Sequence, residues 1–276
     1  KSPATLDTYS GAVAMFGSFL ADKGMPTQPV NIRREHIESF IEQLLKDWKP
    51  ATANNRYRGL QAFFKWLADE GEIKESPMSR MHPPKVPETP PEVLSDADIL
   101  ALFKSCNGKD FEDRRDTAIL RLLLDTGMRR GELAGIMVSH LDLDGTKVTI
   151  TGKGQRTRTV AFGRKTTEAL DRYIRARGQH RNASLPNLWL GLHGPMTAWG
   201  VYQVVVKRAA SAGVRAYTHL FRHTNAHQWL KFEGSETNLM AHMGWKSRTM
   251  LSRYGASRLE ERAREEHKRL GIGDRY

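Results

Sequence analysis

The chain has 276 residues, which is enough for two domains that each bury a hydrophobic core. Its formal net charge is +12 and its isoelectric point is near 9.9, which favours a polyanionic partner. No apolar run approaches the length of a membrane span and no signal peptide is visible, so we expect neither a membrane protein nor a secreted one.

The excess positive charge is not spread evenly along the chain. Residues 1–91 contain 12 Lys and Arg against 11 Asp and Glu, whereas residues 92–276 contain 31 against 20. We therefore expect the polyanion to meet chiefly the C-terminal part of the chain. Cys106 is the one cysteine, so no disulfide can form within the chain, and a reducing compartment such as the cytoplasm is indicated.

Residues 1–82 predict a helical domain. Apolar residues recur at spacings of three and four in three segments, which end near Gly24, Pro50 and Gly71. Such stripes bury one another in a small bundle. The expected buried faces are Leu6, Tyr9, Val13, Phe16 and Leu20 in the first segment, Ile37, Phe40, Ile41, Leu44, Leu45 and Trp48 in the second, and Tyr57, Leu60, Phe63, Phe64 and Leu67 in the third.

Four polar side chains stand at the start of the third segment: Asn54, Asn55, Arg56 and Arg58. Their donors suit phosphate oxygens or base edges of a nucleic acid. They equally suit an ordinary solvated helix start, and the residues alone leave both readings open.

A proline-rich segment follows the helical domain. Five of the eleven residues from Met81 to Pro91 are prolines, so neither a helix nor a sheet can continue through it. We expect residues 83–91 to form an extended, semi-rigid linker.

Residues 92–256 predict a second domain that is mostly helical but contains a small antiparallel sheet. Ser95 is a good N-cap for a helix, and Gly127 supplies the turn that ends the next one. Residues 141–150 alternate as a hairpin, and residues 160–162 predict a third strand. The helix after Ser95 is expected to bury Ile99, Leu100, Leu102 and Phe103, and further helices are expected over residues 166–177, 200–212, 219–231 and 236–243.

Two motifs of this domain carry cationic side chains beside glycines. Residues 126–133 read TGMRRGEL, so Arg129 emerges at a chain reversal and Glu132 is placed to pair with it or with a neighbouring arginine. Lys153 lies between two glycines in the turn between two expected strands. Alone, Arg129 suits a surface arginine and Lys153 suits a solvated loop tip. Together with other motifs, both suit contacts to a phosphate.

A further group of motifs lies between His219 and Tyr254. His219 and Arg222 are three residues apart, so on a helix they share one face and lie in its first turn, where free N–H groups favour an anion. Trp245 follows a glycine, and Tyr254 comes nine residues later. Each motif is weak by itself, because short motifs have high false-positive rates.

Taken jointly, in this order and at these separations, the motifs resemble the tyrosine recombinase (phage integrase) family. The family pattern is T-G-x-R-x-x-E-L, a lysine in a β-hairpin, H-x-x-R, a G-H or G-W pair and a tyrosine nine residues on, and every part of it is present. The resemblance spans almost the whole chain. It implies a mainly α fold, with an N-terminal helical core-binding domain of SAM-like type and a mixed α+β catalytic domain with a small antiparallel sheet.

The resemblance also implies a reaction. A site-specific recombinase of this family cleaves and rejoins DNA strands through a 3′-phosphotyrosine, within a DNA-bound tetramer that forms a Holliday junction. It needs no cofactor and no metal, and we find no Asp, Glu or His cluster with metal-ligand spacing. The implied partners are double-stranded DNA with a specific site, further copies of the chain and accessory DNA-bending proteins. The implied location is the nucleoid, or the host cytoplasm for a phage-encoded protein.

The residues suit distinct roles in such a reaction. Tyr254 is the expected nucleophile, His219 the base toward its proton and Lys153 the acid for the leaving 5′-oxygen. Two arginines and an indole N–H are expected to hold the phosphoryl oxygens. These three residues are Arg129, Arg222 and Trp245; Glu132 and His223 are expected to support them, and Arg156 and Arg158 to hold DNA phosphates. The resemblance also implies that the third helix of the first domain contacts DNA, through Asn54, Asn55, Arg56 and Arg58.

Two other functions stay open on the sequence. A type IB topoisomerase shares this chemistry but relaxes supercoils as a monomer, and a DNA-binding regulator could keep the scaffold without activity. The spacing of Trp245 and Tyr254 and the segment after them favour a recombinase. That segment, residues 257–276, is expected to form a narrow amphipathic helix, either solvated or docked on a neighbouring subunit.

Overall fold

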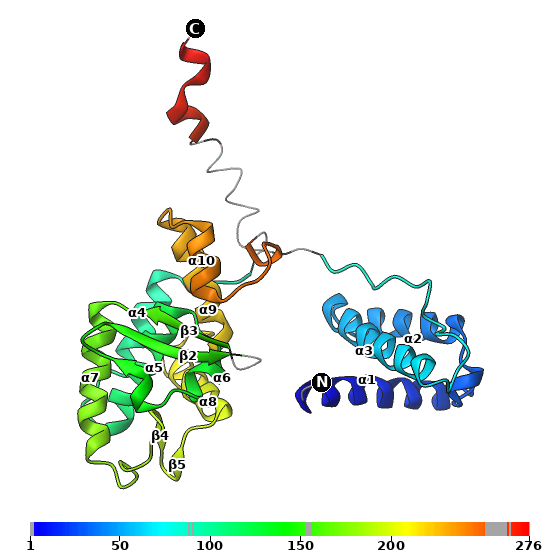
Figure 1. The fold of residues 1–276 in the computed structure, drawn as a ribbon, viewed down its shortest axis with the longest axis horizontal. Helices are drawn as coiled ribbons and strands as arrows, with labels where there is room; N and C mark the ends of the chain where they lie inside the picture. The colour runs from blue at the N-terminus through cyan, green and yellow to red at the C-terminus, as the bar shows by residue number, and fades with distance from the viewer. Residues whose placement is uncertain are drawn as a thin grey trace. The chain divides into compact units, whose positions relative to one another are not determined.

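The computed structural model describes residues 3–87, 89, 91–152, 156–251, 264 and 266–275. The chain divides into two compact units between Glu88 and Thr89, inside the proline-rich segment (Figure 1). Each unit contains its own cluster of buried apolar residues. The division into a core-binding domain, a linker, a catalytic domain and a tail, with the boundaries given above, stays a prediction.

The first unit is a bundle of three helices. Both α1 (Pro3–Asp22) and α2 (Arg34–Asp47) pack on α3 (Pro50–Asp69), and a short 3-10 turn, η1 (Pro29–Asn31), precedes α2. The bundle core is built from the apolar stripes that the sequence predicts. Its most buried members include Phe16, Leu20, Ile37, Phe40, Tyr57, Leu60 and Phe64.

Two details of the first unit differ from expectation. Leu6, Leu45 and Trp48 are 51%, 43% and 53% exposed, although the sequence predicts them on the buried faces of the first two helices. Pro50 ends one helix and begins the next, since a proline without an N–H fits the first position of a helix. As a result Asn54 and its polar neighbours lie in the second turn of α3 and not at its start.

The second unit is larger and mixes helices with short strands. Its elements in chain order are α4 (Asp96–Lys104), α5 (Phe111–Thr126), α6 (Arg130–Ala134), η2 (Val138–His140), β1 (Leu141–Asp142), β2 (Lys147–Gly152), β3 (Arg156–Ala161), α7 (Arg164–Gly178), β4 (Leu190–Gly191), β5 (Gly194–Pro195), α8 (Ala198–Ser211), α9 (Thr218–Lys231), α10 (Glu236–Met243) and η3 (Ile272–Arg275).

Helix α5 is the centre of this unit. It packs on α4, α7, α8 and α9, and its residues Ala118, Ile119, Leu120, Leu122 and Leu123 are fully buried. A helix that is apolar on every side in this way must be surrounded by other elements. Helices α7 and α9 therefore have fixed positions on either side of α5, as Figure 1 shows.

The sheet is antiparallel with the order β1–β2–β3, and Ile150 pairs with Arg158. Val148, Ile150 and Val160 are buried on one face of it, so alternate residues of both long strands point into the core. The mainly α architecture with a small antiparallel sheet is thereby confirmed.

Local signals for helix ends are also confirmed. Ser95 caps α4 by accepting from the Asp98 N–H at 3.1 Å, and Gly127 ends α5 in the left-handed conformation with φ of 56°. Leu100, expected to be buried, is 69% exposed because it points away from α5. In the described part of the chain, no helix has the length and apolar character needed to cross a bilayer.

Candidate active site

Arg222 links two loops of the second unit from within its core. The side chain is 2% exposed and leaves the first turns of α9, whose start at Thr218 agrees with the prediction. Its guanidinium donates to the carbonyl oxygens of Gly127 at 2.7 Å and of Met243 at 2.8 Å. It also lies 5.6 Å from the centre of the Trp245 ring. These contacts place the TGMRRGEL loop and the turn before Trp245 on the two sides of one cation.

Arg129 and Glu132 form a second charged group at the start of α6. The Glu132 carboxylate accepts from the Arg129 backbone N–H at 2.8 Å and from its guanidinium at 3.0 Å. Glu132 is buried, whereas the Arg129 side chain is 50% exposed and available to a ligand. The support that the sequence predicts for Arg129 from Glu132 is therefore a direct contact.

Glu132 has a second partner, which the sequence does not predict. Both carboxylate oxygens accept from the Arg158 guanidinium at 3.0 Å, a bidentate pair between α6 and β3. Burial by itself raises the pKa of the Glu132 carboxyl, but hydrogen bonds from Arg158 and Arg129 and their charges hold its pKa below the usual value. Glu132 is therefore ionised at neutral pH.

His219 lies on the exposed side of the first turn of α9, next to His223. The two imidazole rings meet edge to face, with centres 4.6 Å apart. Partial burial lowers the pKa of His219, and the charges of Arg222 and Arg129 lower it further. The ring is thus neutral near pH 7, the form that can accept a proton. His219 lines one cleft with Arg129, and Arg222 follows it by three residues on α9.

Trp245 belongs to a small apolar cluster behind the site. It is 8% exposed and packs with Ala226, Leu239 and Leu251, the last of which stands three residues before Tyr254 in the sequence. Gly244 precedes it in the left-handed conformation, with φ of 63°, and ends α10. The pair Gly244-Trp245 is therefore a helix C-cap followed by a buried indole.

An open cleft of about 380 Å³ adjoins Arg129 and His219. Its wall includes Arg130, Tyr202 and Tyr217, none of which the sequence pattern singles out. The Arg130 guanidinium lies 5.6 Å from the centre of the Tyr202 ring, which in turn stacks on Trp199. In the sequence, the one signal for this wall is Arg130, the arginine directly after Arg129.

The remaining predicted site residues are placed as follows. Tyr254 and Lys153 lie outside the described residues. Gly152, directly before Lys153, is the last residue of β2. Arg156 is exposed at the other end of the same turn. In the first unit, Asn55 and Arg58 are exposed, whereas Asn54 donates to the Pro84 carbonyl at 2.7 Å and Arg56 is half-buried. Their DNA contacts stay predictions.

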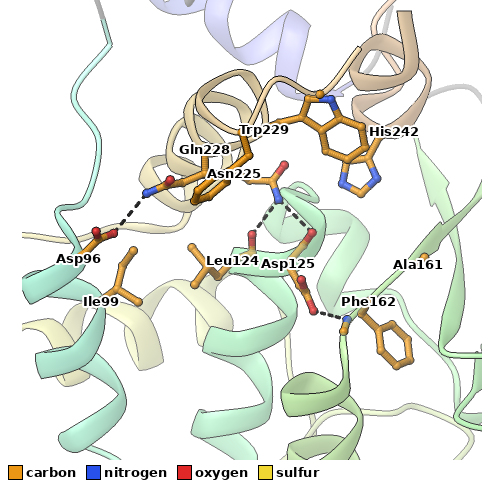
Figure 2. A pocket seen from close by; sticks show the side chains of 13 residues that line it. Asp96, Ile99, Leu124, Asp125, Ala161, Phe162, Asn225, Gln228, Trp229 and His242 are labelled. Carbon is orange, nitrogen blue, oxygen red and sulfur yellow. Dashed lines mark hydrogen bonds between the residues drawn. The ribbon is translucent and has the colours of Figure 1, made fainter. Parts of the chain in front are cut away.

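A larger cavity of about 720 Å³ lies further along α9. Asn225, Gln228, Trp229 and Phe232 line it at helical spacing, together with Asp96, Asp125 and His242 (Figure 2). The Asn225 amide donates to the main-chain oxygens of Leu124 and Asp125. The side-chain oxygens of Asn225 and Gln228 and Nε2 of His242 are buried without a hydrogen-bond partner.

The described residues contain no group of three or more His, Cys, Asp or Glu side chains that could hold a metal ion. Glu132 is the acidic side chain that contacts Arg129, and both of its carboxylate oxygens already accept hydrogen bonds from the guanidinium groups of Arg129 and Arg158.

Residues 92–261 match the phage integrase family, and residues 1–73 match the phage integrase N-terminal SAM-like domain. Among curated proteins, the chain is similar to the tyrosine recombinase XerC of Ralstonia pickettii strain 12J, with 30% identity over 84% of this chain and 77% of the relative. It is also 31% identical to XerC of Thermodesulfovibrio yellowstonii, over 87% of this chain and 80% of the relative.

Solved structures share the fold. The XerH recombinase in a post-cleavage complex with palindromic difH DNA aligns with a TM-score of 0.77 at 18% identity, over 93% of this chain and 78% of that one. A lambda integrase tetramer bound to a Holliday junction aligns with a TM-score of 0.70 at 17% identity, over 90% and 73%. With two matching domains and relatives that align over most of their length, the chain belongs to the phage integrase family and is a tyrosine-type site-specific DNA recombinase.

Proposed function

We propose that this recombinase cleaves each DNA strand through a covalent 3′-phosphotyrosine on Tyr254 and then joins that strand to a new 5′-hydroxyl. The observation that carries the proposal is geometric: Arg129 and His219 line one cleft, and Arg222 bonds to the loop that precedes Arg129 and lies beside the buried Trp245. Two fixed cations and a neutral imidazole are what a phosphoryl transfer without a metal requires.

In the cleavage step the Tyr254 oxygen attacks phosphorus, and the bond between phosphorus and the 5′-oxygen breaks. His219 takes the phenol proton, and Lys153 gives a proton to the departing 5′-oxygen. Arg129 and Arg222 donate to the non-bridging oxygens, whose charge grows in the transition state. The phosphotyrosine keeps the energy of the broken phosphodiester, so the reverse attack by another 5′-hydroxyl needs no ATP.

The exposures of the two arginines suit different parts in this scheme. Arg222 is fixed by two main-chain carbonyls before DNA arrives, so it loses little entropy on binding. Arg129 is half exposed and held on one side by Glu132, which leaves part of its guanidinium for the phosphate. Glu132 thus restrains Arg129 without neutralising the site, because Arg158 supplies a compensating charge.

We further propose that four copies act together on two DNA sites and form a Holliday junction, with accessory DNA-bending proteins as further partners. The solved lambda integrase tetramer with the same fold supports such an assembly. In our proposal, residues 257–276 dock on a neighbouring copy, in the cavity beside α9. Beside its polar residues that cavity is lined by Ile99, Leu124, Phe162 and Trp229, and by Phe232, which is 75% exposed.

A nicked suicide substrate tests the reaction. The protein is incubated in EDTA with nicked duplexes from the sequences that flank its own gene, and denaturing gels are run. We expect a protein–DNA adduct that Tyr254→Phe abolishes. An adduct retained by Tyr254→Phe would show that another residue is the nucleophile, and relaxation of plasmids without any specific site would indicate a topoisomerase instead.

A further inference from the structure

One guanidinium connects three segments that carry the proposed catalytic residues. Arg158 forms the bidentate pair with Glu132, at 3.0 Å for each nitrogen–oxygen contact. Its Nε donates to the carbonyl oxygen of His242 at 3.1 Å, near the C-terminal end of α10. The Arg158 side chain is 17% exposed and that of Glu132 is 4% exposed. The three segments are α6 with Arg129 before it, the β2–β3 hairpin, and the turn that precedes Trp245.

The strand register explains why Arg158 points inward. It pairs with Ile150, and directly opposed residues of an antiparallel ladder lie on the same face. Ile150 is 1% exposed, so this face is turned toward the core. A cation placed there must be paired, because a buried charge without a partner is strongly destabilising.

Two glycines leave room for this pair. A Cβ on Gly152 would lie 3.1 Å from a carboxylate oxygen of Glu132, and one on Gly244 would lie 3.3 Å from a guanidinium nitrogen of Arg158. Gly152 immediately precedes Lys153, and Gly244 immediately precedes Trp245. The glycines of both motifs therefore face the same ion pair, one on either side of it.

We propose that Arg158 is a positioning residue for the cleavage step, which sets Arg129 through Glu132 and fixes the hairpin of Lys153 against α10. This inference rests on the proposed function of the site. It gives Arg158 a role distinct from the phosphate contact that the sequence indicates, because its Nε, Nη1 and Nη2 all donate to protein acceptors. The role requires an arginine, because the planar guanidinium can donate to both oxygens of one carboxylate and an ammonium cannot do so in the same way.

Arg158→Lys is the test, because lysine keeps the charge but cannot form the bidentate contact. The unit offers a matched control in Arg208, whose side chain is 12% exposed. It pairs with Asp116 at 2.7 Å and Asp113 at 2.8 Å and donates to the Ser105 carbonyl, so its set of partners resembles that of Arg158. Arg208→Lys therefore removes a similarly buried guanidinium with three bonded nitrogens, which binds two carboxylates and not both oxygens of one, in a network formed by α5, α8 and the end of α4.

Duplex affinity and the single-turnover rate of adduct formation at saturating DNA are measured for both variants. We expect Arg158→Lys to slow cleavage by about 10²-fold with duplex affinity unchanged, since small misplacements of a catalytic group cost that much. Arg208→Lys should leave the rate near the wild-type value. Weakened duplex affinity with an unchanged saturated rate would identify Arg158 as a phosphate contact and overturn the proposal, as would equal slowing by both variants.

A double-mutant cycle with Arg129→Lys separates positioning from general loosening. If Arg158 acts through Arg129, the second substitution should slow the Arg129→Lys protein much less than it slows the wild type. Additive effects of the two substitutions on the cleavage rate would overturn this part of the proposal, because residues that act independently contribute additively to the activation free energy.

Backbone amide exchange provides a readout without DNA or catalysis. The Arg129 N–H donates to Glu132, so Arg158→Lys should speed its exchange, and Arg208→Lys should not. Unchanged exchange at Arg129 would overturn the proposal. A wild-type protein that forms no adduct would instead refute the proposed function, while this comparison would still decide the role of Arg158.

Discussion

Arg222 donates a 2.7 Å hydrogen bond to the carbonyl oxygen of Gly127, two residues before Arg129. The arginine of one motif thus fixes the backbone from which the arginine of another projects. Its second bond, to the Met243 carbonyl, fixes the turn before Trp245 in the same way. A cation that is both a framework contact and a proposed ligand of the phosphate should show both roles when it is replaced.

Replacement of Arg222 by alanine should cost stability and activity together. The carbonyls of Gly127 and Met243 lose their partner in the core, at about 1–3 kcal/mol for each buried group left unpaired. Cleavage should slow by about 10²–10³-fold because an electrostatic donor is lost. Urea unfolding and single-turnover cleavage measure the two effects.

Arg177→Ala is the control for this loss. Arg177 is 6% exposed and also donates to main-chain carbonyls, among them those of Asn187 and Leu188. Because Arg177 donates to four main-chain carbonyls and Arg222 to two, Arg177→Ala should lower stability at least as much and leave the cleavage rate of the folded fraction unchanged. Equal slowing by both variants would mean that Arg222 acts only through the fold.

Gly244→Ala should be more harmful than the same change at Gly213. Both glycines have positive φ, 63° and 67°, so alanine at either site costs about 1–2 kcal/mol of backbone strain. A Cβ at Gly244 would also lie 3.3 Å from the Arg158 guanidinium, whereas a Cβ at Gly213 would have no heavy atom of another residue within 4 Å. We expect slower cleavage only for Gly244→Ala, measured at equal folded fractions. A normal rate for Gly244→Ala would show that the site tolerates displacement of Arg158.

The His219 ring should titrate below its usual pKa of about 6.5, because partial burial and two arginines disfavour its charged form. Removing one of those charges with Arg129→Gln makes protonation easier, so the His219 pKa should rise. NMR titration of the histidine ring protons measures it, with His219→Gln to assign the signal. A pKa that stays the same in Arg129→Gln would place the two side chains too far apart to act on one phosphate.

His242 should make the second unit less stable at mildly acid pH. Burial, Arg158 and Arg222 lower its pKa in the folded state, although Asp125 and a hydrogen bond to the Thr126 backbone oppose them. The unfolded chain binds the proton more readily, so the stabilising contribution is present above about pH 6.5 and is lost as pH falls toward the folded pKa. Urea unfolding at about pH 7.5 and about pH 5 should show a smaller pH effect for His242→Gln than for the wild type. An unaltered difference between the two pH values would assign the effect to other groups.

Truncation after Ala256 should reduce assembly on DNA. The tail is proposed to dock beside α9, so Phe232→Ser in the receiving cavity should weaken assembly in the same direction. Leu192→Ser is the matched control, because Leu192 is 69% exposed and Phe232 75% exposed, and Leu192 does not line that cavity. Sedimentation of the DNA complexes measures the effect. A truncated protein that assembles and recombines normally would contradict the proposed docking.

Features that depend on neighbouring residues could be predicted from the sequence. The cap at Ser95 and the left-handed Gly127 follow from a few adjacent residues, and α10 spans Glu236–Met243 as predicted. The pairing of His219 and Arg222 on one helix likewise follows from a three-residue spacing.

Tertiary relationships could not be predicted in this way. The bond between Glu132 and Arg158 joins residues 26 apart in sequence, and it depends on the strand register that turns Arg158 inward. Leu100 and Trp48 lie at the edges of apolar stripes, and only the packing of neighbouring helices decides whether an edge is covered. The sequence identified Arg222 as a ligand but not as a core residue, because burial of a charge requires acceptors from distant loops.

Helix α9 contributes residues to the walls of two hollows of the second unit. The cleft beside Arg129 meets α9 at His219, near the start of the helix, whereas Asn225, Gln228 and Trp229 line the larger cavity further along it (Figure 2). An occupant of the larger cavity that moves α9 would also change the cleft beside Arg129. Thermodynamic reciprocity then requires that DNA engagement alter the affinity of the cavity for its occupant by the same factor as the occupant alters the affinity for DNA. With residues 257–276 of a neighbouring copy as the proposed occupant, this coupling would make strand cleavage depend on whether that neighbour is in place.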